Sequence, residues 1–329
     1  MKEKQIIESV NTLKGLACIG VVLMHCNFPG LLGKVLLYFF KFSVPAFFMI
    51  SGYFLFPSSN NQINNKLSKQ IRKIAKLLFF CFVFYGILDF VFRCYTNDCI
   101  SPKKWLFDVF NISLLPRKVI FGTFFNGTLW YLYALIWSYI VLKRFYKVFC
   151  SKPLVWAFIL IFLHIFTRLF VKSQGYDWYI ANYWRSFLFW GIPFILLGFS
   201  IAKYKKNFIM MNSYLLIIVS FFCFLLQFFE YYCYKQSLDF YFSTILYSLS
   251  IFILAIKNPN KKISIFLNYV GRKLSMYIYI IHMSVISILS YTVFSFVTSP
   301  YEKPFLTLLL SICVAQLYVS ISAYFHRNS

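Results

Sequence analysis

A lysine and a histidine lie in one apolar stretch near the start of the chain, and both can do chemistry. Lys14 and His25 are eleven residues apart within the segment 9–26, SVNTLKGLACIGVVLMHC. Eleven residues of α-helix make three turns plus roughly 20°, so the two side chains share one face with Asn11 and Cys18. Ionisable groups in a membrane helix usually line a protein-enclosed cavity. His25 can take a proton from a hydroxyl near neutral pH, and Lys14 can hold an anion.

A second histidine lies in an apolar stretch near the other end of the chain. His282 follows Ser275 by seven residues, about two helical turns, so these two side chains also share a face. A hydrogen bond between packed helices would explain His282 as well as a role in a cavity would. Asp89 is the one carboxylate deep enough in an apolar stretch to neutralise Lys14 or Lys41.

Five basic side chains form a stripe that could bind phosphate. Lysines at spacings of three and four residues lie on one face of a helix, with an arginine beside them. The ordinary explanation is the excess of positive charge on the cytoplasmic side of membrane proteins. The functional explanation is a polyphosphate site for coenzyme A or a nucleotide. The stripe comprises Lys66, Lys69, Arg72, Lys73 and Lys76.

The composition indicates a helical membrane protein. Of the 329 residues, 60% are hydrophobic and 23% aromatic, with 43 Phe and 25 Tyr, and the mean hydropathy is +0.70. Repeated apolar stretches of about 18 residues or more are typical of membrane-spanning helices. The net charge of +24 suggests nucleic acid. We exclude that partner because the basic residues form short clusters between apolar stretches and mark no soluble domain.

We predict an all-α fold, a polytopic membrane bundle of about ten transmembrane helices in a single domain over residues 1–329. The first stretch lacks a signal-cleavage pattern and is expected to be retained. The predicted spans are Ile6–Phe28, Val35–Phe56, Ile74–Arg93, Thr128–Phe149, Leu154–Val171, Ser186–Tyr204, Phe208–Phe229, Phe240–Ile256, Leu274–Phe294 and Phe305–Phe325.

The distribution of Lys and Arg predicts that both termini are cytoplasmic. The longest connection, 94–127, then lies outside, and its segment Lys104–Leu115 is predicted to form an interfacial amphipathic helix. Cys94 and Cys99 fall in this connection, where a disulfide is possible. No C-x-x-C pair, P-loop, G-x-S-x-G or H-E-x-x-H motif occurs, so we expect no metal and no permanently bound cofactor.

Six motifs occur in order along nearly the whole chain. They are Asn11-Thr-Leu-Lys14-Gly followed by His25, the segment VPAFFMISGYF at 44–54, the basic cluster around Lys69 and Arg72, GTLWYLYAL at 127–135, Arg185 through Gly198, and Gly271 through His282. Together they resemble the acyltransferase 3 family of ten-span bacterial membrane acyltransferases. In that family Asp and Arg stand at the positions of Asn11 and Lys14, and His often stands at that of Thr128. Lysine keeps the charge of arginine but loses its bidentate geometry.

The resemblance implies transfer of an acyl group, usually acetyl from cytoplasmic acetyl-CoA, to a sugar hydroxyl of a surface glycan or its lipid-linked precursor. The protein would lie in the bacterial inner (cytoplasmic) membrane, with acetyl-CoA as co-substrate. We expect His25 and Lys14 to be catalytic, His25 as general base, and Lys69, Arg72 and Lys73 to bind the acyl-CoA phosphates. The residues expected to line the cavity and position the acceptor are Asn11, Ser51, Trp130, Arg185, Ser275 and His282.

Two other functions are compatible with the residues. A transporter or flippase for a small anion or a lipid-linked sugar would also use buried basic side chains. A purely structural membrane subunit would leave Lys14 and His25 unexplained. A requirement for His25 in chemistry, not only in passage of a substrate, separates the enzyme from the transporter.

Overall fold

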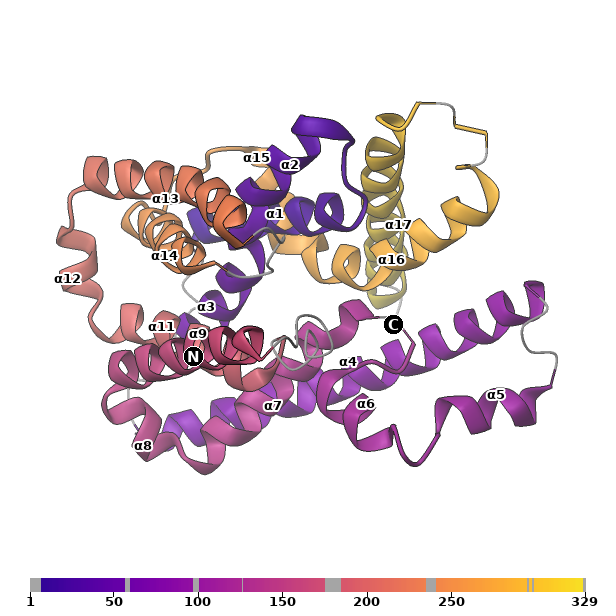
Figure 1. Cartoon of the computed structure of the whole chain (residues 1–329), viewed down its shortest axis with the longest axis horizontal. Coiled ribbons are helices and arrows are strands. Elements are labelled where there is room, and N and C mark those ends of the chain that lie inside the picture. Colours follow the sequence, from indigo (N-terminus) through magenta and orange to yellow (C-terminus); the bar gives the residue numbers. More distant parts are fainter. Residues whose placement is uncertain are drawn as a thin grey trace. The chain divides into compact units, whose positions relative to one another are not determined.

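The computed structural model describes residues 7–56, 60–96, 101–125, 127–174, 185–234, 241–294, 296–297 and 299–327. These residues form helices and no strand, so the all-α prediction is confirmed. The helices group into two units: unit 1 comprises Met1–Phe47 and Tyr204–Ser329, and unit 2 comprises Phe48–Lys203. In Figure 1, unit 1 is indigo and orange to yellow, and unit 2 is purple to magenta.

Unit 1 is built around its first helix. This helix, α1, contacts α2, α14, α15, the π-helix η4, α16 and α17, while α13 packs along α14 (Figure 1). The bounds are α1 (Glu8–His25), α2 (Gly30–Phe39), the 3-10 helix η1 (Phe40–Phe42), α12 (Lys205–Met210), α13 (Ser213–Tyr234), α14 (Phe242–Lys257), α15 (Ile265–Tyr269), η4 (Val270–Leu274), α16 (Ser275–Thr292) and α17 (Glu302–Arg327).

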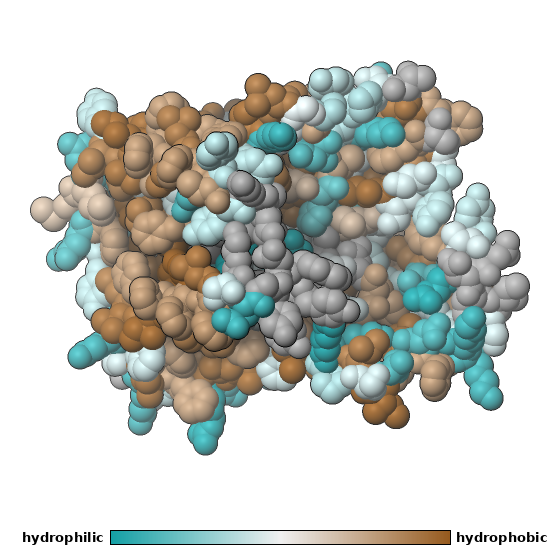
Figure 2. Space-filling view, viewed as in Figure 1, coloured by the Kyte–Doolittle hydropathy of each residue, from teal (hydrophilic) through white to brown (hydrophobic). Residues whose placement is uncertain are grey.

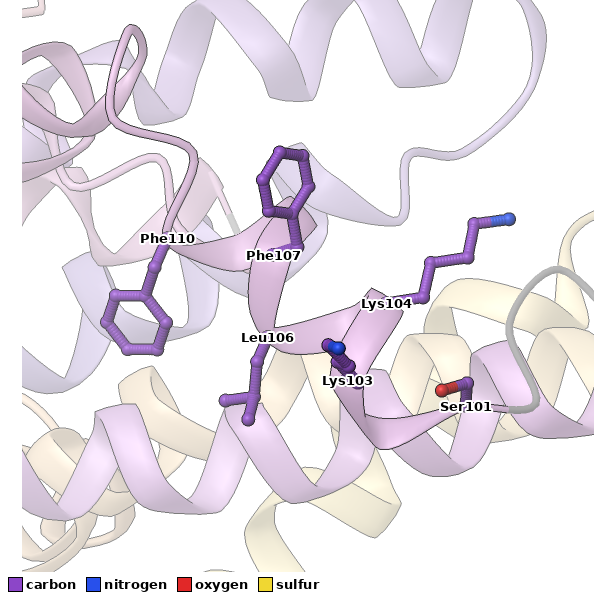
Figure 3. Close-up of a pocket in the computed structure, with 6 residues that line it drawn as sticks. All are labelled: Ser101, Lys103, Lys104, Leu106, Phe107 and Phe110. Atoms are coloured by element: carbon purple, nitrogen blue, oxygen red, sulfur yellow. The ribbon is translucent and has the colours of Figure 1, made fainter.

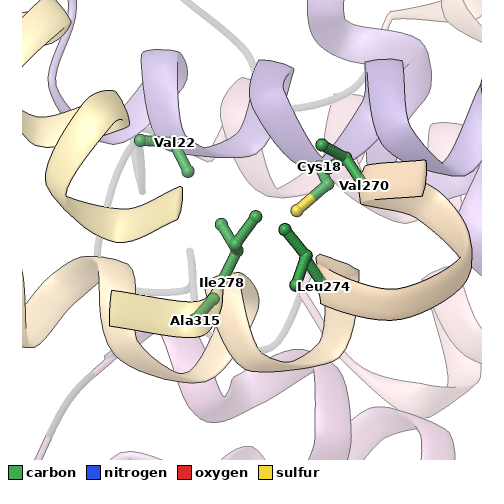
Figure 4. Packing of buried hydrophobic residues seen from close by; sticks show 6 residues of the cluster. All are labelled: Cys18, Val22, Val270, Leu274, Ile278 and Ala315. Carbon is green, nitrogen blue, oxygen red and sulfur yellow. The ribbon is translucent and has the colours of Figure 1, made fainter. Parts of the chain in front are cut away.

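A buried cluster joins four of these helices. Its members are small or branched apolar side chains that face one another from α1, η4, α16 and α17 (Figure 4). Lipid tails are as apolar as these side chains, so close van der Waals packing holds such helices together in a bilayer. The cluster consists of Cys18, Val22, Val270, Leu274, Ile278 and Ala315, each at most 2% exposed.

The backbones of α1 and η4 touch at a pair of glycines. A Cβ atom on Gly271 would overlap the carbonyl oxygen of Asn11 and lie 2.6 Å from the backbone nitrogen of Gly15. A Cβ atom on Gly15 would overlap the carbonyl oxygen of Leu267. Only glycine permits so close an approach of two helices. The crossing therefore sets how the segment after Gly271 lies against α1.

Unit 2 contains a second close crossing. A Cβ atom on Gly52 of α3 would overlap the carbonyl oxygen of Ile195, and one on Gly198 of α11 would overlap that of Met49. The elements are α3 (Ser43–Leu55), which begins in unit 1, α4 (Asn60–Tyr95), α5 (Pro102–Val109), α6 (Leu115–Phe121), the 3-10 helix η2 (Gly127–Leu129), α7 (Trp130–Arg144), α8 (Tyr146–Ser151), α9 (Pro153–Ser173), the π-helix η3 (Phe187–Gly191) and α11 (Ile192–Lys203).

Several helices are suited to a multi-pass membrane protein. Every one of the ten predicted spans contains a helix, but the number ten remains a prediction. Phe187–Lys203 and Phe242–Lys257 are apolar but shorter. The helices α1 and α7 are not both long enough and apolar enough to be counted as candidate membrane crossings. Among the described residues, six stretches are long and apolar enough to cross a membrane: Gly30–Leu55, Gln62–Tyr95, Pro153–Val171, Ser213–Tyr234, Ile265–Thr292 and Glu302–Phe325.

Large apolar side chains cover parts of the surface. Ile218 and Phe222 on α13, and Phe162 and Phe166 on α9, are each more than half exposed. Figure 2 shows that much of the face in view is hydrophobic. A soluble protein rarely exposes such extended patches, whereas the hydrocarbon core of a bilayer covers them at no cost.

Several predicted boundaries differ from the structure, and two of the differences bear on the site. The first helix was expected to continue to Phe28 but ends at His25, because Pro29 disfavours the helical conformation of the residue before it. The third span was expected to begin at Ile74, but α4 begins at Asn60 and runs for 36 residues. That length, about 54 Å, exceeds the roughly 30 Å hydrocarbon core, so the basic N-terminal part of α4 extends beyond it.

The described part of the connection 94–127 contains two short helices, α5 and α6, where one was predicted. The expected helix Lys104–Leu115 is confirmed only as far as Val109, where α5 ends. The side-chain oxygen of Asn111 accepts a hydrogen bond from the N–H of Ser113 at 3.1 Å, which turns the chain before α6. The predicted pairing of Cys94 with Cys99 cannot be followed, because Cys99 lies outside the described residues.

Reporter fusions after Asn260 and after Lys303 test the topology. The described chain has one candidate crossing between these positions, Ile265–Thr292. We therefore expect opposite sides whatever the total number of spans, and the distribution of Lys and Arg predicts that Asn260 is cytoplasmic and Lys303 external. Alkaline phosphatase and fluorescent-protein fusions at both positions measure this, and two reporters on the same side would contradict the arrangement of α16 and α17.

Replacing Gly271 by alanine should lower the stability of the protein. The added methyl group would meet backbone atoms, which cannot move aside as a flexible side chain could, and overpacking of this kind costs about 1–3 kcal/mol. Thermal unfolding of the detergent-solubilised protein measures the change. Gly127→Ala is the matched control, because a Cβ atom there meets nothing within 4 Å. Equal melting temperatures for the two variants would show that α1 and η4 do not pack this closely.

Candidate active site

His25 is the last residue of α1, and its side chain is exposed. The N–H of Cys26 still bonds to the carbonyl oxygen of Val22, at 3.0 Å, before the chain leaves the helix. The sequence suggested a position inside a span, but α1 ends at His25 and leaves the imidazole exposed. An exposed ring at a helix end can exchange protons without opening the core.

His282 lies against His25. The ring centroids are 5.3 Å apart, and the ring planes are inclined at 43°. His282 is completely buried on α16. Its Nδ1 atom lies 2.7 Å from the carbonyl oxygen of Tyr279 and 3.2 Å from that of Ile278. The two histidines come from opposite ends of the chain, so the site exists only in the folded protein.

Three contacts show that α1 runs alongside η4 and α16 in the same direction. Gly15 meets Gly271, the thiol of Cys18 donates to the carbonyl oxygen of Ser275 at 3.5 Å, and His25 meets His282. Cys18 and His25 are seven residues apart, and so are Ser275 and His282. Equal spacing on two parallel helices keeps successive pairs in register.

Part of the α1 face predicted from the spacing of polar residues packs against η4 and α16. The main chain of Asn11 packs on Gly271, and Cys18 faces Ser275. Lys14, between these two contacts, is half-buried, as is Asn11. Unit 1 therefore contains Asn11, Lys14, His25, Ser275 and His282 along one pair of helices. The role of these glycines was not recognised in the sequence, although both lie in the motifs named above.

The remaining predicted residues belong to unit 2. The side chain of Ser51 lies close to the phenol groups of Tyr131 and Tyr139, so α3 and α7 bring Ser51 next to the turn that carries Trp130. The Trp130 ring packs edge-on against Trp190 with centroids 5.6 Å apart. These groups form an aromatic and hydroxyl-rich cluster. A cluster of this kind can hold a substrate by stacking and hydrogen bonds.

Arg185 lies just before the N-terminus of η3. The next residue, Ser186, caps this helix by accepting a hydrogen bond from the N–H of Phe189 at 3.4 Å. Arg185 itself is half-buried. Its role in positioning the acceptor stays a prediction.

The basic stripe lies on one helix, as predicted. Lys69, Arg72, Lys73 and Lys76 are exposed on the N-terminal part of α4, and none forms an ion pair with a described carboxylate. Lys66 is half-buried and donates to the carbonyl oxygen of Phe56 at 3.0 Å. Four exposed cations within two helical turns are available to an anion.

The expected carboxylate partner of the buried cations has another role. Asp89 accepts hydrogen bonds from Nε of Arg93 at 3.0 Å and from the indole of Trp105 at 2.8 Å, and so ties α5 to α4. Lys41 is buried, and its ammonium lies 4.5 Å from the ring centroid of Tyr241. Aromatic faces stabilise such a cation. The sequence suggested a carboxylate as the partner of Lys41, whereas the structure places the ring of Tyr241 beside it.

A shallow hollow borders α5 (Figure 3). All of its lining residues come from this helix and its immediate flanks, so it lacks the several walls that a substrate cavity needs. Lysine and phenylalanine side chains on one short helix suit the surface of a bilayer. The lining residues are Ser101, Lys103, Lys104, Leu106, Phe107 and Phe110.

Comparison with known proteins identifies the family. A family model described as an acyltransferase domain matches residues 7–325, nearly the whole chain, and extends through both units. Neither a curated protein nor a solved structure matches the chain. The resemblance inferred from the six sequence motifs is confirmed: the chain belongs to the acyltransferase 3 family and is a membrane acyltransferase.

Proposed function

We propose that the protein is an O-acetyltransferase that moves an acetyl group from cytoplasmic acetyl-CoA to a hydroxyl of a cell-surface glycan or its lipid-linked precursor. It acts in the bacterial inner membrane with both termini cytoplasmic. The observation that carries the proposal is the exposed imidazole of His25 at the end of α1, next to a second, buried histidine. An accessible imidazole can act as the general base that takes the proton of a hydroxyl nucleophile.

The reaction needs one proton carrier. The acceptor oxygen attacks the thioester carbonyl carbon while His25 takes the hydroxyl proton. The C–S bond then breaks, and the leaving thiolate takes the same proton from His25. The products are an ester and coenzyme A thiol, and His25 returns to its neutral form. Cys26 follows His25 by one residue, but its sulfur accepts a hydrogen bond from Thr307, and no acyl-enzyme is required.

Lys14 is too far from His25 to act on the reacting atoms. Eleven residues of α-helix rise about 16 Å, more than a lysine side chain can bridge. An extended donor such as acetyl-CoA resolves this, because its phosphates and its thioester lie at opposite ends of a long pantetheine arm. Lys14 then holds an anionic part of the donor while the thioester reaches His25. Lys14 is therefore a binding residue, and it contacts the same acetyl-CoA molecule as His25 does.

The exposed stripe on α4 supplies the initial docking site for the donor. Lys69, Arg72 and Lys73 lie within about one helical turn, which suits the phosphates of coenzyme A. If the N-terminus is cytoplasmic, this part of α4 extends into the cytoplasm, where acetyl-CoA is made.

Removing positive charge from the stripe should weaken donor binding. Lys69→Ala, Arg72→Ala and Lys73→Ala should each raise the KM for acetyl-CoA several-fold, with little change in the KM for the acceptor, because each removes a contact made throughout the reaction. Steady-state kinetics of the purified protein measure both constants. Lys103→Ala is the control, since Lys103 is equally exposed but lies on α5. Unchanged donor constants in all three variants would leave the stripe as a topology signal only.

His25→Ala should abolish most of the chemistry and leave donor binding intact. Loss of a general base costs roughly 10²–10⁴ in rate. Transfer of labelled acetate from acetyl-CoA to extracted glycan precursor measures the rate, and calorimetry with coenzyme A checks binding. A His25→Ala variant with wild-type turnover would exclude this mechanism. Substrate movement across proteoliposomes without acetyl transfer would support a transporter instead.

A further inference from the structure

We propose that His282 is a positioning residue for His25: its Nε2 accepts a hydrogen bond from one ring N–H of His25. The bond fixes the tautomer of His25, so that the other ring nitrogen is the one that meets the acceptor hydroxyl. The bond itself is a property of the fold, whereas its use in catalysis rests on the proposed function. In this role His282 acts on the general base, His25. Direct contact of His282 with the acceptor is disfavoured, because His282 is completely buried.

The hydrogen bonds of His282 determine its own tautomer. Its Nδ1 atom has two carbonyl oxygens as partners, from Ile278 and Tyr279, and a carbonyl only accepts. Nδ1 therefore carries the proton in the neutral ring, and Nε2 presents a lone pair. The bond made by one ring nitrogen sets the chemistry of the other.

The lone pair of Nε2 needs a donor. The atom is buried and has no hydrogen-bond partner among the described residues. A buried acceptor without a partner is unfavourable, and most buried polar atoms are paired. His25 is the neighbouring group with an N–H to give, since its ring lies next to that of His282.

The distance between the rings fits one hydrogen bond. Two imidazoles joined by an N–H···N bond of roughly 3 Å, with each nitrogen about 1.1 Å from its ring centre, have centroids a little over 5 Å apart. The observed separation is 5.3 Å. The planes are tilted by 43°, and Nε2 of His282 has no hydrogen-bond partner among the described residues in the observed rotamer of the exposed His25 side chain. Rotation of the His25 side chain completes the bond.

The arrangement has the logic of a base oriented by a third group. In a Ser-His-Asp triad, a buried acceptor holds the histidine in the tautomer that can accept the proton. Here a neutral histidine takes the place of the carboxylate. It stabilises the imidazolium of His25 less than a carboxylate would, but it adds no buried charge to a helix in the membrane.

Three variants of His282 separate positioning from packing. His282→Gln places an amide oxygen near the position of Nε2 and keeps an acceptor. His282→Asn retains a donor near the position of Nδ1 but loses that acceptor, and His282→Phe keeps only a ring. Ser311→Ala is the control for the neighbouring helix α17, where the hydroxyl of Ser311 is also buried without a described partner.

The direct readout is the tautomer of His25. Nitrogen-15 NMR of histidine-labelled protein reports it, and the His25 signals are assigned by their loss in His25→Ala. We expect one dominant tautomer in the wild type, His282→Gln and Ser311→Ala, and a mixture in His282→Asn and His282→Phe. The kcat for acetyl transfer should fall roughly 10–100-fold in the last two, as for other residues that orient a functional histidine, while the KM for acetyl-CoA stays unchanged.

Three results would overturn the proposal. An unchanged His25 tautomer in a folded His282→Phe protein would show that no bond joins the rings. A His282→Gln variant that matches His282→Phe in tautomer and kcat would show a packing role. A tautomer shift in Ser311→Ala would make Ser311 the partner of Nε2. Absence of acetyl transfer by the wild type would end the proposed function, and the NMR result would still decide whether the two histidines are bonded.

Discussion

The contact between the backbones of Gly15 and Gly271 is the constraint on which the site depends. It lets α1 and η4 approach until main-chain atoms touch, and the two helices then continue in parallel. From there, seven-residue spacings carry the register from Cys18 and Ser275 to the two histidines. A side chain at either glycine would push α16 away, and every contact further along would open.

The bilayer explains why the contact takes this form. Apolar helices gain little by leaving lipid for one another, so their association relies on close packing and on the few polar contacts available. Unit 2 uses the same solution, with Gly52 and Gly198 packed on the main chain of the facing helix. Glycines in the sequence motifs of this chain are therefore as informative as its histidines, because they fix the distances at which polar groups meet.

The sequence predicted what depends on local periodicity. The helical class and the placement of the basic stripe on one helix, α4, follow from composition and from spacings of three and four residues. Features set by distant contacts were not predictable. The neighbour of His25 is His282, Asp89 bonds to Trp105 on α5, and Lys41 lies on a tyrosine ring. A single sequence does not show which helices touch.

The distance between Lys14 and His25 gives α1 two functions. About 16 Å of helix separates the residue that can hold an anion from the residue that can take a proton. A compact acyl donor would meet only one of them, whereas a donor with phosphates at one end and a thioester at the other meets both. The length of α1 between these two residues therefore limits which acyl donors could contact both of them.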